Sequence, residues 1–166
     1  MENLYLIGMM GCGKSTCGGL LSRRLARPLL DTDVEIEKSA GMTVSEIFAQ
    51  QGEEAFRNLE TALCRELAER EHLIVACGGG LPLRRENREL LRGGGLVVFL
   101  QRDPEAIFDS VDMGARPLGQ QGKAAFLARY RDRLPLYQAA AHITLRDFST
   151  PEATVEELCR ILGENL

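Results

Sequence analysis

The sequence contains no tryptophan, and aromatic residues make up only 5% of its 166 positions. The core must therefore be built mainly from aliphatic side chains. Basic residues are not in excess either, because the formal net charge is −4. Proteins that bind nucleic acids or anionic membranes usually present a broad basic surface. We therefore expect neither partner, and any anionic ligand must be held by a few local cations.

Long apolar runs are also absent. No segment approaches the roughly 18 apolar residues of a membrane span, and the first residues lack the basic and apolar regions of a signal peptide. The five cysteines are an odd number without metal-ligand spacing, which indicates free thiols in a reducing compartment. These features predict a cytoplasmic protein with one domain over residues 1–166. We expect it to be a monomer.

Short apolar runs alternate with segments of helical periodicity. Buried parallel strands give such runs, and an alternation of strands and helices predicts an α/β fold with a parallel sheet. The five predicted strands are Leu4–Ile7, Pro28–Leu30, Leu73–Ala76, Leu96–Leu100 and His142–Leu145.

Three helix starts carry capping signals. Thr43 and Glu46 have the spacing of a capping box, and Asp103 and Thr150 each precede a proline that can occupy the first helical position. A further helix is expected over Glu53–Arg70. Its apolar residues recur at helical spacing and predict one buried stripe. These residues are Phe56, Leu59, Leu63 and Leu67.

The segment from Asp109 to Gln121 is unlike the rest of the chain. It has few core residues and contains glycine and proline. A long segment of this kind within a compact domain is typical of a mobile lid over an active site.

The strongest functional signal is Gly8-Met-Met-Gly-Cys-Gly-Lys-Ser15, which matches the P-loop pattern between a predicted strand and a predicted helix. Glycines let several backbone N–H groups surround a phosphate, and the helix N-terminus adds partial positive charge. Lys14 is expected to contact the β and γ phosphates, and the Ser15 hydroxyl is the expected Mg²⁺ ligand. The alternative is a glycine-rich turn with an exposed lysine.

Asp31 and Asp33 follow the second predicted strand at the sheet edge where ligands bind in open α/β folds. One carboxylate could face the water shell of a metal and the other an acceptor hydroxyl. In the alternative interpretation, Asp33 caps a helix that begins at Val34.

Gly78, Gly79 and Gly80 follow the third predicted strand. Glycines there leave N–H groups open and allow a ligand to approach closely. A second triplet, Gly93–Gly95, is expected to be a plain flexible turn, and the same alternative applies to the first.

Three arginines are candidates for binding a carboxylate or phosphate through the two-pronged guanidinium. Arg57 is expected with Glu60 on the exposed edge of its helix, Arg116 lies in the predicted lid, and Arg133 lies in Arg-Leu-Pro-Leu-Tyr137. Each could instead be a solvated surface residue.

Together these residues resemble the shikimate kinase family from end to end. The resemblance covers the P-loop with its trailing Ser15-Thr16, Asp31-Thr-Asp33, Gly52–Arg57 with Glu60, the glycine run, Arg116-Pro-Leu and Arg133-x-x-x-Tyr137. The set is far more specific than any one member.

The resemblance implies a three-layer P-loop fold with a five-stranded parallel sheet of order 2-3-1-4-5, helices on both faces and a mobile lid. It implies transfer of the γ-phosphoryl group of ATP to the 3-hydroxyl of shikimate, a step of aromatic amino-acid biosynthesis, with Mg²⁺ as cofactor. Catalytic roles fall on Lys14, Asp33 and Arg116, and Mg²⁺ binding falls on Ser15 and Asp31.

The expected ligand-binding residues form two groups. Shikimate is expected to contact Asp33, Arg57, Gly78, Gly79, Gly80 and Arg133. ATP is expected to contact Gly11, Cys12, Gly13, Lys14, Ser15, Thr16 and Arg116. The chain departs from the family pattern at Cys77, where threonine is usual, and over Asp109–Ala115, which has no basic residue.

Two other functions remain open from the residues. Gluconate and nucleoside-monophosphate kinases share the P-loop and lid, but a nucleotide acceptor needs a base pocket and several phosphate-binding arginines. An Asp-x-Asp with a glycine run suits a polyhydroxylated ring acid better. A non-catalytic nucleotide-binding module is the other hypothesis, against which Lys14, Ser15, Asp31 and Asp33 all count.

Overall fold

The computed structural model describes residues 2–110, 122–146 and 150–164. Five parallel strands form one sheet of order β2-β3-β1-β4-β5, as expected. The strands are β1 (Asn3–Ile7), β2 (Leu29–Asp31), β3 (Ile74–Ala76), β4 (Gly95–Gln101) and β5 (Ile143–Arg146). All five coincide with the predicted apolar runs to within one residue at each end.

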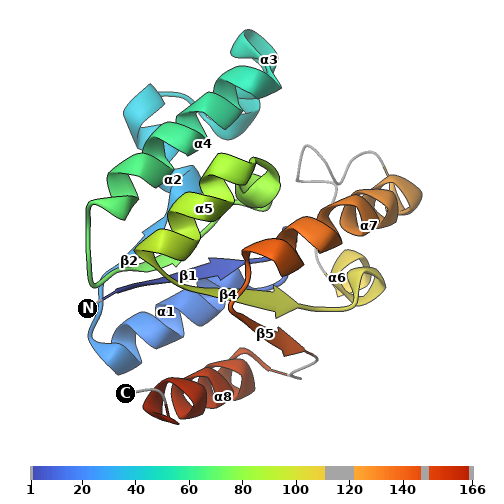
Figure 1. The fold of residues 1–166 in the computed structure, drawn as a ribbon. Coiled ribbons are helices and arrows are strands. Elements are labelled where there is room, and N and C mark those ends of the chain that lie inside the picture. The colour runs from blue at the N-terminus through green and yellow to red at the C-terminus, as the bar shows by residue number, and fades with distance from the viewer. Residues whose placement is uncertain (1, 111–121, 147–149, 165–166) are drawn as a thin grey trace.

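Helices cover both faces of the sheet (Figure 1). One face carries α1 and α8, and the other carries α4, α5 and α7, which gives three layers. The helices are α1 (Lys14–Leu25), α2 (Thr32–Ala40), α3 (Val44–Gln51), α4 (Glu53–Ala68), α5 (Arg85–Gly94), α6 (Pro104–Ser110), α7 (Lys123–Ala140) and α8 (Pro151–Glu164). A short 3-10 helix, η1, spans Leu81–Leu83.

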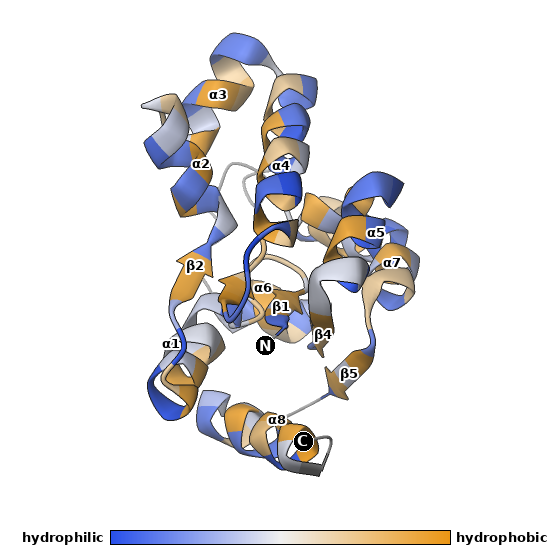
Figure 2. Ribbon diagram, turned by 60° about the vertical axis from the view of Figure 1, so that its left-hand side comes forward, coloured by the Kyte–Doolittle hydropathy of each residue, from blue (hydrophilic) through white to orange (hydrophobic). Residues whose placement is uncertain are grey.

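Apolar residues are concentrated in the sheet and on the helix faces that meet it (Figure 2). β1 and β3 are buried throughout, which agrees with the apolar runs that form them, although β1 begins with the buried polar residue Asn3. A second, smaller cluster of Ile36, Ile47 and Phe56 joins α2, α3 and α4 beyond the β2 edge. This cluster fixes the start of α4 relative to α2, both of which carry candidate site residues.

The three predicted helix starts are confirmed by their hydrogen bonds. Thr43 Oγ1 accepts the Glu46 N–H (3.1 Å), Asp103 Oδ1 accepts the Glu105 N–H (3.1 Å), and Thr150 Oγ1 accepts the Ala153 N–H (3.1 Å). A side-chain oxygen therefore satisfies an otherwise unpaired donor at each start.

One expectation about loops is wrong, and another lies mostly outside the described residues. Gly93–Gly95 is not a flexible turn, because α5 runs to Gly94 and β4 begins at Gly95. A Cβ at Gly95 would collide with the backbone of Asn3 on β1, so this glycine allows two strands to approach. Of the predicted lid at 109–121, Asp109 and Ser110 end α6, and residues 111–121 lie outside the described part of the chain.

In the described residues, no helix is both long and apolar enough to cross a membrane.

Candidate active site

The P-loop connects β1 to α1 as predicted. Gly11 and Gly13 have φ values of 82° and 98°, in the left-handed region that glycine adopts without steric cost. Lys14 donates from Nζ to the carbonyl oxygens of Gly8 (2.7 Å) and Met9 (2.9 Å), so its ammonium group lies against the loop and is 9% exposed. The loop thus combines one cation with the N-terminal end of α1.

Ser15 and Asp31 meet across the P-loop. The Ser15 hydroxyl donates to Asp31 Oδ2 at 3.0 Å, while Thr16 is exposed beside it on α1. Asp31 Oδ1 also accepts the N–H groups of Asp33 (3.0 Å) and Val34 (3.3 Å). Asp31 is therefore the N-cap of α2, and the alternative in which Asp33 caps a helix from Val34 is wrong.

A hydroxyl and a carboxylate at this separation suit Mg²⁺, which takes oxygen ligands and keeps several waters together with substrate phosphates. A P-loop metal needs few protein ligands. The lack of a group of three or more His, Cys, Asp or Glu side chains in the described residues therefore does not conflict with a site at Ser15 and Asp31.

Asp33 lies in the first turn of α2 and turns inward. Its Oδ1 is 2.6 Å from the position of a Cβ added at Gly78, so the carboxylate lies directly against the glycine run. Burial raises the pKa of Asp33, and the neighbouring charge of Asp31 raises it further, while Lys14 and Arg57 act in the opposite direction. A raised pKa makes this carboxylate a stronger proton acceptor than an exposed aspartate.

Arg57 and Glu60 are not on an exposed edge, contrary to the expectation from the sequence. Arg57 is 8% exposed and Glu60 is 0% exposed. Arg57 donates from Nη1 to Glu60 Oε1 (2.8 Å) and from Nη2 to Glu53 Oε1 (3.1 Å). Burying charges is costly unless they are paired, so these contacts explain how α4 can turn a charged pair inward.

The predicted apolar stripe of α4 is only partly correct. Phe56 and Leu67 are buried, but Leu59 and Leu63 are only partly so.

Burial raises the pKa of Glu60 to about 7, against the opposing effect of the Arg57 guanidinium.

Each glycine of the run Gly78–Gly80 lies against a different candidate substrate residue. A Cβ at Gly78 would meet Asp33, one at Gly79 would lie 3.5 Å from Arg133 Nη1, and one at Gly80 would overlap the Arg57 guanidinium. The run is therefore not a plain flexible turn. Three elements, α2, α4 and α7, bring their charged groups to one stretch of backbone that leaves space for them.

Arg133 comes from α7 and is 6% exposed. Its charge and that of Asp33 both act on Glu60, so Asp33, Arg57, Glu60 and Arg133 share one electrostatic neighbourhood. The structure thus brings together all the predicted substrate residues. Arg116 lies outside the described residues.

Three supporting residues had no assigned role in the sequence analysis. Glu53 and Glu60 hold Arg57, and the Thr32 hydroxyl accepts the Gly78 N–H at 2.8 Å. Glu60 lies three positions after Arg57 and Glu53 four positions before it, and this helical spacing was the sequence signal for the two ion pairs.

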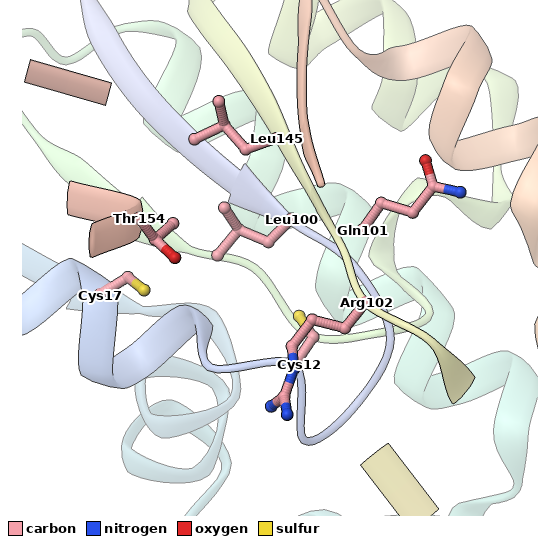
Figure 3. A pocket seen from close by; sticks show the side chains of 7 residues that line it. All are labelled: Cys12, Cys17, Leu100, Gln101, Arg102, Leu145 and Thr154. Atoms are coloured by element: carbon pink, nitrogen blue, oxygen red, sulfur yellow. The ribbon is translucent and has the colours of Figure 1, made fainter. Parts of the chain in front are cut away.

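A small pocket lies beside the P-loop, between α1, the end of β4 and α8 (Figure 3). The Arg102 side chain runs from the end of β4 toward Cys12 of the loop. The pocket is lined by Cys12, Cys17, Leu100, Gln101, Arg102, Leu145 and Thr154. Burial raises the pKa of the Cys17 thiol to about 11, so this cysteine is largely protonated at neutral pH.

Comparison with known proteins gives one consistent result. The profile of the shikimate kinase family matches residues 10–162. Shikimate kinase of Clostridium botulinum (strain Alaska E43 / Type E3) is 37% identical over 99% of this chain and 100% of the relative. That of Symbiobacterium thermophilum is 41% identical over 98% of this chain and 97% of the relative.

Solved structures agree. Shikimate kinase from Acinetobacter baumannii in complex with shikimate superposes with a TM-score of 0.89 at 36% identity, covering 100% of this chain and 96% of that one. A gluconokinase from Sinorhizobium meliloti reaches a TM-score of 0.56 at 17% identity, over 98% of this chain and 94% of that one, which supports a shared fold only. The chain belongs to the shikimate kinase family.

Proposed function

We propose that this protein is an ATP-dependent shikimate kinase that transfers the γ-phosphoryl group of ATP to the 3-hydroxyl of shikimate. The products are 3-phosphoshikimate and ADP, in the pathway to aromatic amino acids. The observation that carries the proposal is the convergence of Asp33, Arg57 and Arg133 on the glycine run beside the P-loop. A carboxylate and two guanidinium groups suit an acceptor with hydroxyls and one carboxylate.

In this proposal, Arg57 and Arg133 bind the shikimate carboxylate, and the N–H groups of the glycine run contact the ring oxygens. Asp33 orients the 3-hydroxyl and accepts its proton as the oxygen–phosphorus bond forms and the bond to the β-phosphate oxygen breaks. Lys14 and Arg116 offset charge on the transferring group, because the transition state is loose and needs mainly positioning and electrostatic stabilisation.

ATP would lie on the P-loop, with its phosphates held by the backbone of Gly11 to Gly13 and by Lys14, Ser15 and Thr16. The small pocket beside Cys12 lies next to the loop that would hold those phosphates. Ser15 and Asp31 would hold Mg²⁺, which supplies positive charge to the β and γ phosphates. We further propose that the enzyme acts as a cytoplasmic monomer.

The test is a coupled ADP-release assay with shikimate, gluconate and nucleoside monophosphates as separate acceptors. Of these acceptors, we expect only shikimate to support ADP release. Lys14→Ala should lose most of this activity, since one preorganised charge-stabilising group typically contributes about 2.7–4 kcal/mol to transition-state stabilisation. Faster turnover with gluconate or a nucleotide would reassign the substrate. ATP binding without ADP release for any acceptor would favour a non-catalytic module.

A further inference from the structure

The carbonyl of Gly79 is held differently from those of its neighbours. The carbonyls of Gly78 and Gly80 accept N–H groups from the turn that follows them, and the Gly78 N–H donates to Thr32 Oγ1. The Gly79 carbonyl instead accepts the hydroxyl of Tyr137, 58 positions later in the chain, at 2.7 Å. This bond joins the glycine run to α7.

The remaining polar groups of the run are its donors. Within the described residues, no hydrogen bond from the N–H of Gly79 or Gly80 is present. Two neighbouring backbone donors are thus left to a ligand, beside the guanidinium groups of Arg57 and Arg133. Buried or half-buried N–H groups are normally paired, so an unused pair at a site indicates a binding function.

The Gly79–Gly80 peptide is planar, and its carbonyl and N–H point in opposite directions. A bond that fixes the Gly79 carbonyl therefore also fixes the direction of the Gly80 N–H. Neither residue has a Cβ, so few steric barriers oppose rotation of this peptide in the absence of such a bond. The Tyr137 hydroxyl supplies the restraint that side chains would supply elsewhere.

Tyr137 is itself held by packing. It is 1% exposed, and its ring lies against Phe99 of β4 with centroids 5.1 Å apart. The hydroxyl also lies 3.7 Å from Met9 Sδ, a weak acceptor, and near Arg133. Burial raises the pKa of Tyr137, against the smaller, opposing effect of the Arg133 guanidinium. Because the ring is fixed by these apolar contacts, phenylalanine at this position would keep the packing and remove the hydroxyl alone.

We infer that Tyr137 is a positioning residue for the acid substrate, whose hydroxyl holds the Gly79–Gly80 peptide so that its N–H stays directed to a substrate oxygen. The inference rests on the proposed function, because the oxygen belongs to shikimate. It assigns Tyr137 an effect on the acceptor and none on the nucleotide, which in the proposed function is held by Gly11 to Thr16.

The experiment compares Tyr137→Phe with wild type by titration calorimetry, using shikimate and ATP separately. Loss of one hydrogen bond predicts a shikimate Kd about three- to tenfold higher. The ATP Kd should change by less than about twofold. The shikimate KM should rise in parallel, with a smaller change in kcat.

Tyr5→Phe is the matched control. Tyr5 is also fully buried, and its hydroxyl accepts from Asn3 Nδ2 at 3.0 Å, but it contacts the start of β1 rather than the glycine run. Tyr5→Phe should leave both Kd values unchanged even if it lowers Tm. In ¹⁵N spectra, only Tyr137→Phe should broaden or split the Gly80 amide resonance.

An unchanged shikimate Kd in Tyr137→Phe would overturn the inference, and so would equal weakening of shikimate and ATP, which indicates a general packing defect. These outcomes are separate from failure of the proposed function. If wild type itself did not bind shikimate, the assignment of substrate would fail before any variant was compared.

Discussion

Gly80 owes its identity to a side chain from another element. The Arg57 guanidinium occupies the space in which any Cβ at position 80 would lie, and Glu53 and Glu60 hold that guanidinium in place. A substitution here therefore moves a charged group rather than filling free volume. The glycine and the arginine act as one unit, although 23 positions separate them in the chain.

We expect Gly80→Ala to weaken shikimate binding by at least about tenfold, because a displaced guanidinium loses a charged hydrogen bond of roughly 1.5–3 kcal/mol. ATP affinity should be preserved. Gly93→Ala is the control, since a Cβ there meets nothing within 4 Å. Titration calorimetry with each ligand separately measures the two Kd values. A shikimate Kd within twofold of wild type would show that Arg57 does not bind the shikimate carboxylate.

Asp33 has two proposed tasks, orienting the acceptor hydroxyl and taking its proton. Asparagine keeps an oxygen for the first task but cannot perform the second. Asp33→Asn should therefore lower kcat by about 10²–10⁴-fold, the usual range for general-base catalysis, and weaken shikimate binding far less.

The pH dependence gives an independent check of Asp33. Its pKa is raised, so wild-type activity should fall as the pH drops through this pKa and the carboxylate is protonated. That acid limb should be absent from the residual activity of Asp33→Asn. Equal losses in kcat and in affinity would instead make Asp33 mainly a binding residue.

At the scale of elements, α2 is joined to the P-loop through Asp31. One oxygen of this carboxylate caps α2, and the other accepts the Ser15 hydroxyl at the start of α1. The chain thus uses a single side chain both to begin a helix and to complete the proposed Mg²⁺ site. The two roles differ in chemistry, because capping needs an oxygen whereas metal binding also needs the negative charge.

Asp31→Asn should separate these roles. Asparagine caps helices about as well as aspartate, so Tm should stay close to that of wild type. The Mg²⁺ concentration for half-maximal activity should rise about 10- to 100-fold, the typical effect of losing a partner that supports a metal ligand. Thr43→Ser, at the N-cap of α3, controls for capping changes. An unchanged Mg²⁺ requirement would remove Asp31 from the metal site.

At the scale of the whole molecule, the features that were predictable depend on neighbours in sequence. Buried parallel strands require apolar runs, helix starts need an oxygen within three residues, and a P-loop is one contiguous segment. Each therefore leaves a local pattern. The sheet order and the meeting of the substrate residues were predictable only through the family resemblance.

Features that depend on distant partners were missed. Helical periodicity predicts that charged residues face solvent, so Arg57 and Glu60 were expected at an exposed edge. In the structure both are buried, because the Arg57 guanidinium fills the space over Gly80 and Glu60 pairs with it. The bond between Tyr137 and the Gly79 carbonyl likewise joins segments that have no common local pattern. The single-domain and monomer assignments and the role of Arg116 stay predictions.

The buried Glu60 should make the stability of the whole fold depend on pH. Its pKa rises from 4.5 to about 7 on folding, chiefly because burial disfavours the charged form. Between these values the folded chain holds a proton that the unfolded chain has released. Stability from this residue is therefore present at pH 4.5 and lost as the pH rises to about 7.

Glu60→Gln tests this directly, because glutamine keeps an oxygen for Arg57 but cannot titrate. From pH 5 to pH 8, the unfolding free energy of wild type should fall by on the order of 2 kcal/mol more than that of Glu60→Gln. Denaturant unfolding at intermediate pH values measures the difference, in which contributions shared by both proteins, such as that of His142, cancel. Glu66→Gln, at an exposed position of α4, should follow wild type. Parallel profiles for wild type and Glu60→Gln would mean that the Arg57 guanidinium keeps Glu60 ionised throughout, and the pair would then contribute a fixed ionic contact at all these pH values.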